Sequence, residues 1–310
     1  MKTVYDHIKS NNRKTLALIL AFPAIFIALV FLFVWAALAL TAAPGQDIMA
    51  EALAVSASVA IPVGGIALVW MLISWAFGDS MMLSMAGAVQ VHEDEKEYRE
   101  LFRAVQNVSL AAGLPMPRVY IINDNGMNAF ATGRGPADAS VAFTRGILTA
   151  LDRDELSGVI AHEMAHIGNR DIRMDMLIIT GLGVTVFAAD ILFRMAMFGG
   201  NDSERDKGQM RAILFAVWGA FMVFNFVISP ILRMAISRRR EYLADATGAF
   251  ITRNPRALAS ALSKISGRSA VGGARKSMAE AFIANPLKGL GGLFATHPPI
   301  EERVKRLSNM

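Results

Sequence analysis

The chain contains no cysteine among its 310 residues. Disulfide bonds and thiolate metal ligands are therefore excluded, and a transition-metal site would have to be built from histidine and carboxylate side chains. Histidine is also scarce, because the whole chain has only five. The search for such a site is therefore confined to a few positions.

Charged side chains are sparse as well. They make up 18% of the residues, against 54% hydrophobic residues and a mean hydropathy of +0.41. Residues 16–40 and 52–77 contain no charged residue, and each run exceeds the roughly 20 residues that a helix needs to cross a bilayer. We predict two membrane-spanning helices, with buried core helices as the alternative. The first run is longer than the roughly 7 to 15 apolar residues of a signal peptide, so we expect a retained anchor.

Lysine and arginine are missing from the linker between these runs, residues 41–51. Four basic residues precede the first run instead: Lys2, Lys9, Arg13 and Lys14. Because basic residues stay on the cytoplasmic side of a membrane, this asymmetry predicts a cytoplasmic N-terminus and an external linker. The net charge of +5 is modest and its basic residues flank apolar runs, so we expect a lipid bilayer, and no nucleic acid, as a partner.

A second apolar pair lies farther along the chain. Residues 212–232 are uncharged, but residues 176–198 contain Asp190 and Arg194, each of which costs roughly 2.5 to 3.5 kcal/mol at a membrane centre. The two side chains are four residues apart and can pair on one helix face, which reduces that cost. We favour a membrane hairpin, and a cytoplasmic or interfacial hairpin remains the alternative.

Local patterns predict a mixed α+β layout for the remainder. Residues 92–103 have a helical pattern, residues 118–123 form a short strand before a turn, and Asn254-Pro255 starts a helix. Residues 267–292 are rich in glycine and are expected to be irregular, and residues 300–307 form a short helix.

One helix carries a metal-binding pattern. Asp152 and Glu155 resemble a capping box, and apolar residues continue at helical spacing, which predicts a helix over residues 153–167. Within it, His162, Glu163 and His166 match H-E-x-x-H. The four-residue spacing places both imidazoles on one face, and Glu163 lies beside them as a general base for the attacking water. The alternative is a pair of surface histidines, against which the apolar residues of this helix argue.

A catalytic zinc site needs a third protein ligand. His7 and His92 lie in solvated stretches, so a carboxylate is the better candidate. Glu241 follows three arginines, and Asp245 lies one turn later, where it can accept the free N–H of a ligand histidine. Taken alone, this pair would be a solvated helix face. If Glu241 and His166 share a metal, the chain between them crosses the membrane twice or not at all.

Taken together, these features resemble the HtpX-like membrane metalloproteases, which are related to the CAAX prenyl proteases. The likeness extends to His297-Pro298-Pro299 near the C-terminus. It implies an α+β, mainly helical gluzincin domain with one zinc ion, bound by His162, His166 and Glu241, on a four-helix transmembrane anchor. It also implies that His297 and Arg303 lie near the scissile carbonyl. The residues of the implied substrate-edge strand are Asn128, Ala129, Phe130 and Ala131.

The resemblance further implies a bacterial inner-membrane endopeptidase that degrades misfolded or damaged membrane proteins, with its active site and both termini in the cytoplasm. The expected parts are residues 1–78 with two spans, 79–175 as the protease core, 176–236 as the membrane hairpin, and 237–310 as the rest of the protease domain. Two alternatives remain: CAAX-type processing of prenylated proteins, for which the chain has few apparent spans, and a zinc-stabilised membrane adaptor without turnover.

Overall fold

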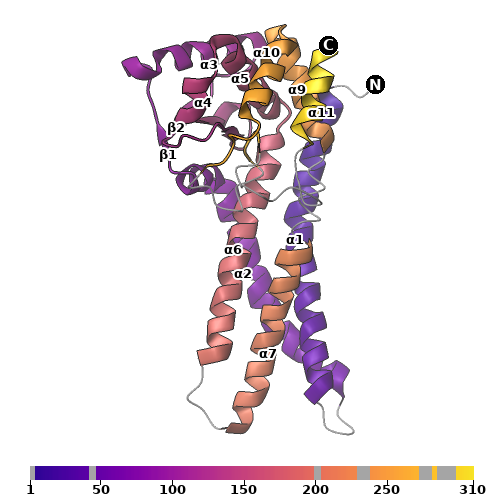
Figure 1. Cartoon of the computed structure of the whole chain (residues 1–310). Helices are drawn as coiled ribbons and strands as arrows, with labels where there is room; N and C mark the ends of the chain where they lie inside the picture. The colour runs from indigo at the N-terminus through magenta and orange to yellow at the C-terminus, as the bar shows by residue number, and fades with distance from the viewer. Residues whose placement is uncertain (1–3, 42–46, 199–203, 229–237, 272–280, 285–297) are drawn as a thin grey trace. The chain divides into compact units, whose positions relative to one another are not determined.

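The computed structural model describes residues 4–41, 47–198, 204–228, 238–271, 281–284 and 298–310 (Figure 1). By their internal contacts, the residues form two compact units. Unit 1 comprises Met1–Lys14, Trp75–Thr180 and Arg233–Met310, and unit 2 comprises Thr15–Ser74 and Gly181–Leu232. The four-part division expected from the sequence remains a prediction.

Unit 2 is built from parts of long helices. These are α1 (Val4–Thr41), α2 (Ile48–Met85), α6 (Asp171–Phe198) and α7 (Glu204–Val223), which a π-helical turn, η3 (Phe224–Ile228), continues. Small residues let these helices approach one another, since a Cβ atom on Gly64 would lie 3.0 Å from Ile27 Cδ1. Thr185 Oγ1 donates to Asn225 Oδ1 at 2.7 Å, so α6 and η3 are joined by a polar contact.

One described helical segment, Gly64–Met85, is both long and apolar enough to cross a membrane. Two shorter apolar segments accompany it, Ile27–Ala39 and Arg211–Val227. The predicted pairing on α6 is confirmed, because Arg194 Nε lies 2.8 Å from Asp190 Oδ2. The four-span anchor remains a prediction.

Unit 1 contains a four-stranded mixed sheet in the order β1-β2-β4-β3. Its strands are β1 (Ala88–Gln90), β2 (Arg118–Ile122), β3 (Ala129–Thr132) and β4 (Ser140–Thr144). The central pair, β2 and β4, is parallel, and each edge strand runs antiparallel to its neighbour. The strand predicted at residues 118–123 is confirmed to within one residue, and β3 forms one edge of the sheet.

Helices surround this sheet in unit 1. They are η1 (Lys96–Tyr98), α3 (Arg99–Ala112), η2 (Pro136–Asp138), α4 (Arg145–Ala150), α5 (Arg153–Gly168), α9 (Arg238–Thr252), α10 (Pro255–Ile265) and α11 (Ile300–Ser308). Helix α5 packs against α3, α9, α10 and β3, and its buried face belongs to the main hydrophobic core. The described residues are mostly helical with one sheet, as the α+β prediction requires.

The helix expected over residues 92–103 was placed too early. Residues 92–95 form a turn, in which His92 N donates to Glu95 Oε1 at 2.8 Å and Glu95 N donates to His92 O at 3.1 Å. The acidic side chain therefore caps the turn, and the α-helix begins only at Arg99 and continues to Ala112.

The start of α5 is fixed as predicted. Asp152 Oδ1 accepts from Glu155 N at 2.9 Å, and Glu155 Oε2 accepts from Asp152 N at 2.9 Å, which completes a capping box. Glu155 also accepts from Lys264 Nζ at 2.6 Å. Because Lys264 belongs to α10, the same carboxylate that starts α5 also holds it against its neighbour.

Candidate active site

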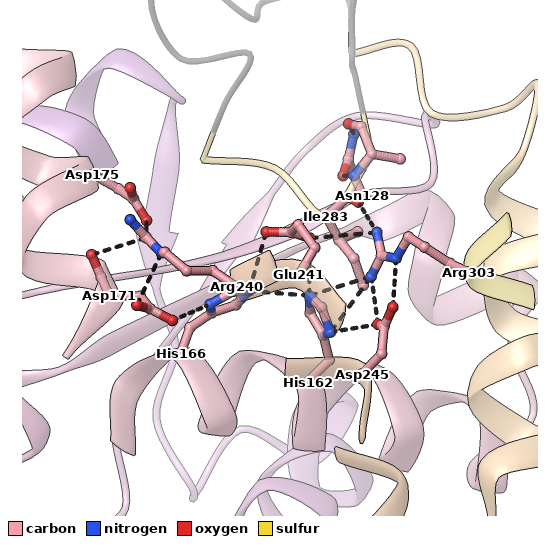
Figure 2. Close-up of polar contacts among 11 residues, drawn as sticks. Asn128, His162, His166, Asp171, Asp175, Arg240, Glu241, Asp245, Ile283 and Arg303 are labelled. Atoms are coloured by element: carbon pink, nitrogen blue, oxygen red, sulfur yellow. Dashed lines mark hydrogen bonds and ion pairs between the residues drawn. The ribbon is translucent and has the colours of Figure 1, made fainter. Parts of the chain in front are cut away.

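Two imidazole rings of α5 lie side by side, nearly perpendicular to each other (Figure 2). His162 and His166 lie one turn apart, and their Nε2 atoms are 3.2 Å from each other. The side chains are largely buried, with exposed fractions of 1% and 12%. Both Nε2 atoms are therefore directed at one position at the surface of α5.

Helix α9 contributes a third group that can bind a metal at this position. Glu241 Oε2 lies 3.7 Å from His162 Nε2, and Glu241 Oε1 lies 3.6 Å from His166 Nε2. Donor atoms about 2.0 to 2.2 Å from a tetrahedral zinc ion stand roughly 3.3 to 3.6 Å apart. The two Nε2 atoms are 3.2 Å apart, and each lies 3.6 to 3.7 Å from one oxygen of the Glu241 carboxylate, which is close to this spacing. The three residues therefore form a possible metal site of the His, His, Glu type.

A glycine lets α9 reach α5 at this point. A Cβ atom on Gly248 would lie 3.0 Å from the backbone nitrogen of His162, which is tighter than packed helices ordinarily allow. Gly248 stands two turns after Glu241, on the same helix. Its lack of a side chain thus brings the third donor within reach of the two imidazoles.

A carboxylate lies behind each imidazole. Asp245 Oδ1 is 3.0 Å from His162 Nδ1, and Asp171 Oδ2 is 2.9 Å from His166 Nδ1. Each carboxylate can accept a hydrogen bond from Nδ1–H, which fixes the ring and leaves Nε2 free to bind a cation. The place of Asp245 was expected from its spacing after Glu241, whereas Asp171 was not singled out.

The two imidazoles differ in their pKa values. Burial lowers the pKa of His162 and outweighs the hydrogen bond to Asp245. Burial also acts to lower the pKa of His166, but the hydrogen bond to Asp171 and the charge of Glu241 raise it to about 9. Without a metal, His166 is therefore protonated at neutral pH, and a binding cation must displace that proton.

Glu163 faces the same region as the three donors. Its side chain is buried, with an exposed fraction of 2%. It lines a small cavity together with Ala131, His162, His166, Ile172, Asp175, Glu241, Ala281, Phe282 and Ile283. A carboxylate is thus available beside the metal site, in a space where the edge of the sheet also meets α5.

Arg303 from α11 lies beside His162 and Asp245. The guanidinium is fully buried and forms two hydrogen bonds with Asp245, at 2.8 Å from Nε and 2.7 Å from Nη2. Its Nη1 is 3.5 Å from Glu241 Oε2 and donates to Ile283 O at 3.1 Å. Arg303 therefore places a positive charge beside the donors, whereas His297 lies outside the described residues.

The expected substrate-edge residues lie next to this cavity. Ala129, Phe130 and Ala131 belong to β3, and Asn128 immediately precedes the strand. All four are buried, and Ala131 lines the cavity with Glu163. The structure thus brings the edge strand close to the possible metal ligands, and its role in binding substrate remains a prediction.

Comparisons with known proteins identify the family. Residues 95–310 match Peptidase family M48. A "Protease HtpX homolog" from Thermoanaerobacter pseudethanolicus is 39% identical over 312 residues, which cover 100% of this chain and 98% of the relative. The chain belongs to peptidase family M48. This M48 peptidase is similar to a second "Protease HtpX homolog", from Syntrophobacter fumaroxidans, at 42% identity over 250 residues, or 79% of this chain and 87% of the relative.

Among solved structures, the M48 peptidase is similar to one titled "Crystal Structure of S. mikatae Ste24p". The TM-score is 0.47 and the identity 17%, with coverage of 97% of this chain and 66% of that chain. The resemblance to HtpX-like metalloproteases drawn from the sequence is confirmed by the family match and the curated relatives.

Three residues of the M48 peptidase site were missed by the sequence analysis. Arg240 Nε lies 2.9 Å from Asp171 Oδ1, and Arg240 Nη2 lies 2.7 Å from Asp175 Oδ2. Arg240 thus holds in place the carboxylate that contacts His166. Burial acts to raise the pKa of Asp171, but the charge of Arg240 and the hydrogen bond and charge of His166 together lower it. In the sequence, these residues are marked only by their nearness to the predicted metal ligands, because Asp171 follows His166 by five residues and Arg240 precedes Glu241.

Asp171→Asn is expected to weaken zinc binding by about 10- to 100-fold, as loss of a carboxylate behind a ligand histidine typically does. An amide lacks the negative charge that fixes the His166 ring through Nδ1. Competition with a chromophoric chelator at constant pH measures the affinity. Asp154→Asn, at an exposed position of the same helix, is the matched control and should bind zinc like the unaltered chain. Equal affinity of the Asp171→Asn and Asp154→Asn variants would remove Asp171 from this role.

Proposed function

We propose that the chain is a zinc-dependent endopeptidase, in which His162, His166 and Glu241 bind one zinc ion and Glu163 is the general base. The observation that carries this proposal is the convergence of three side chains: the two Nε2 atoms are 3.2 Å apart, and Glu241 places one carboxylate oxygen 3.7 Å from His162 Nε2 and the other 3.6 Å from His166 Nε2. Glu163 lines the same cavity as these donors. A purely structural zinc site is closed by four protein ligands and has no use for such a carboxylate.

Different residues of the chain have different roles in the proposed hydrolysis. Zinc, when bound, supplies Lewis acidity that polarises the scissile carbonyl and makes water more acidic. Glu163 takes a proton from the attacking water and delivers it to the leaving amine. Asp245 and Asp171 hold the two imidazoles in position, through Nδ1 distances of 3.0 and 2.9 Å. Because the cavity is small and its donors are buried, these groups are oriented before the substrate arrives.

Arg303 is proposed to stabilise the negative charge that develops on the carbonyl oxygen. Its guanidinium is held by two hydrogen bonds to Asp245 and already donates to a backbone carbonyl, Ile283 O, at 3.1 Å. A preorganised donor of this kind typically contributes about a hundredfold to a thousandfold in rate. His297 is proposed as a second donor to the same oxygen, on the strength of the resemblance.

The proposed substrates are misfolded or damaged membrane proteins, cleaved on the cytoplasmic side of a bacterial inner membrane. Two other functions compete with this one: processing of prenylated C-terminal peptides at the same zinc, and a zinc-stabilised adaptor without turnover. The experiment offers the purified chain an unlipidated, unfolded membrane protein and a prenylated peptide in competition. We expect cleavage of the membrane protein. Preferred cleavage of the prenylated peptide would favour the processing function, and cleavage of neither substrate by zinc-loaded chain would favour the adaptor.

The proposed membrane topology predicts which loops face outward. We expect single cysteines, Ala43→Cys in the first loop and Ser203→Cys in the second, to react in intact cells with a thiol reagent that does not cross membranes. The native chain has no competing thiol. Ser308→Cys is the control for the cytoplasmic side and should react only after the cells are opened. Labelling of the first loop but not the second would show that the later hairpin does not span the membrane.

A further inference from the structure

The outer edge of β3 is occupied by a segment of the same chain. Ile283 N donates to Ala129 O at 2.9 Å. The next residue, Ala284, meets the residue before it on the other strand, because Ala284 N donates to Asn128 Oδ1 at 3.3 Å. Ascending positions in one segment therefore face descending positions in the other, which is the order of an antiparallel pair.

Side chains follow the same register. Phe282 faces Phe130, with ring centroids 5.2 Å apart in an edge-to-face arrangement. Ala281 and Ala131, one position farther along, line the same cavity. Phe282, Ile283 and Ala284 are buried, with exposed fractions of 0%, 2% and 2%. The four residues 281–284 form a turn followed by bends, and they lie against the edge of β3 with the Phe282 side chain enclosed.

Polar side chains donate to the two successive carbonyl groups of Ile283 and Ala284. Arg303 Nη1 donates to Ile283 O at 3.1 Å, and Asn128 Nδ2 donates to Ala284 O at 2.8 Å. Backbone pairing to a strand edge, together with pockets for alternate side chains, is how extended peptides are recognised. Ile283 and Phe282 also line the cavity that contains Glu163, His162 and Glu241. The segment therefore occupies part of the strand edge that an extended peptide would need, at the place where the proposed chemistry occurs.

We propose that residues 281–284 fill the edge of β3 that the resemblance assigns to the substrate, and that a substrate must displace them with an extended apolar segment carrying a large side chain in the position of Phe282. This inference rests on the proposed endopeptidase function and adds two properties to it. The site selects for a bulky apolar residue beside the scissile region, and the chain competes with its own substrate. Self-occupancy lowers the apparent affinity for substrate in proportion to the fraction of molecules whose edge is free.

The test measures binding rather than cleavage, in full-length chain purified in detergent and carrying Glu163→Gln. The probe is a fluorescent peptide with the sequence of residues 279–286, followed by anisotropy. Ile283→Pro removes the N–H that pairs with Ala129 O, so we expect the probe to bind at least about tenfold more tightly to this variant. Replacing phenylalanine by alanine in the probe should weaken its binding about tenfold, because a buried aromatic contact is lost.

A reversible lock provides a second, independent variant. Ala131→Cys combined with Ala281→Cys places thiols at opposite positions of the pair, and the chain has no other cysteine. Oxidation should form the disulfide and reduce probe binding at least about tenfold, and a reductant should restore it. Each single cysteine variant is a control and should not respond to oxidation.

Failure of the disulfide to form, or full probe binding to the locked chain, would overturn the inference. So would weaker probe binding by the Ile283→Pro variant if its melting temperature is unchanged. If that variant unfolds, the reversible lock decides alone. Absence of proteolysis by the unaltered chain would count against the proposed function, and the binding results would remain interpretable without it.

Discussion

Glu163→Gln is expected to retain zinc and the fold while lowering kcat by about a hundredfold to ten-thousandfold, the range that a general base contributes. Glutamine has nearly the same shape as glutamate, but its amide cannot accept a proton from the attacking water. The Glu163 side chain is buried and lines the cavity beside the metal ligands, so no other base can readily reach the attacking water from solvent. Steady-state kinetics on one peptide substrate, together with metal analysis, measure both quantities.

A matched control is available on the surface. Glu301→Gln makes the same chemical change at an exposed position of α11 and should leave kcat and zinc content unchanged. Comparable turnover by the Glu163→Gln variant and the unaltered chain would refute the assigned role of Glu163. Loss of zinc from the Glu163→Gln variant would instead mean that this carboxylate helps to hold the metal.

Glu241→Ala is expected to release zinc. Only two imidazoles would remain to bind it, whereas a catalytic zinc site needs three protein ligands. The loss of affinity should exceed the roughly 10- to 100-fold effect of removing a carboxylate behind a ligand. Competition with a chelator and metal analysis after dialysis measure the change, and proteolysis should fall in parallel.

The contrast with Glu163→Gln makes this prediction specific. Both substitutions remove a buried acidic group from the same cavity, yet only Glu241→Ala should empty the site. Full zinc occupancy in the Glu241→Ala variant would remove Glu241 from the ligand set. A melting temperature measured for both metal-free proteins separates loss of the ligand from loss of the fold.

The parts of the site that the sequence predicted depend on short-range signals. Asp152 and Glu155 set the start of α5, and the observed helix, Arg153–Gly168, ends one residue after the prediction. Asn254 caps α10 through Ala257 N at 3.2 Å, again three residues away. Such signals act within one helical turn, where spacing alone determines which groups can meet.

Several of the contacts that were missed join residues far apart in the sequence. Arg240 meets Asp175 across 65 positions, and Asn128 meets Ala284 across 156. Nothing in the local pattern around these residues indicates their partners. The strand β4 was also missed, because all five of its residues are buried and a short buried strand has no alternation of polar and apolar residues. The fold of the chain, and not its local sequence, brings these groups to the site.

The most direct test of the central claim is the metal dependence of proteolysis by the purified chain. An unfolded protein substrate is incubated with the enzyme before chelation, after chelation, and after one equivalent of zinc is returned. We expect cleavage to stop when metal analysis shows the site to be empty, and zinc to restore cleavage in the unaltered chain but not in the Glu163→Gln variant. Cleavage that continues at its original rate in metal-free protein would contradict the account.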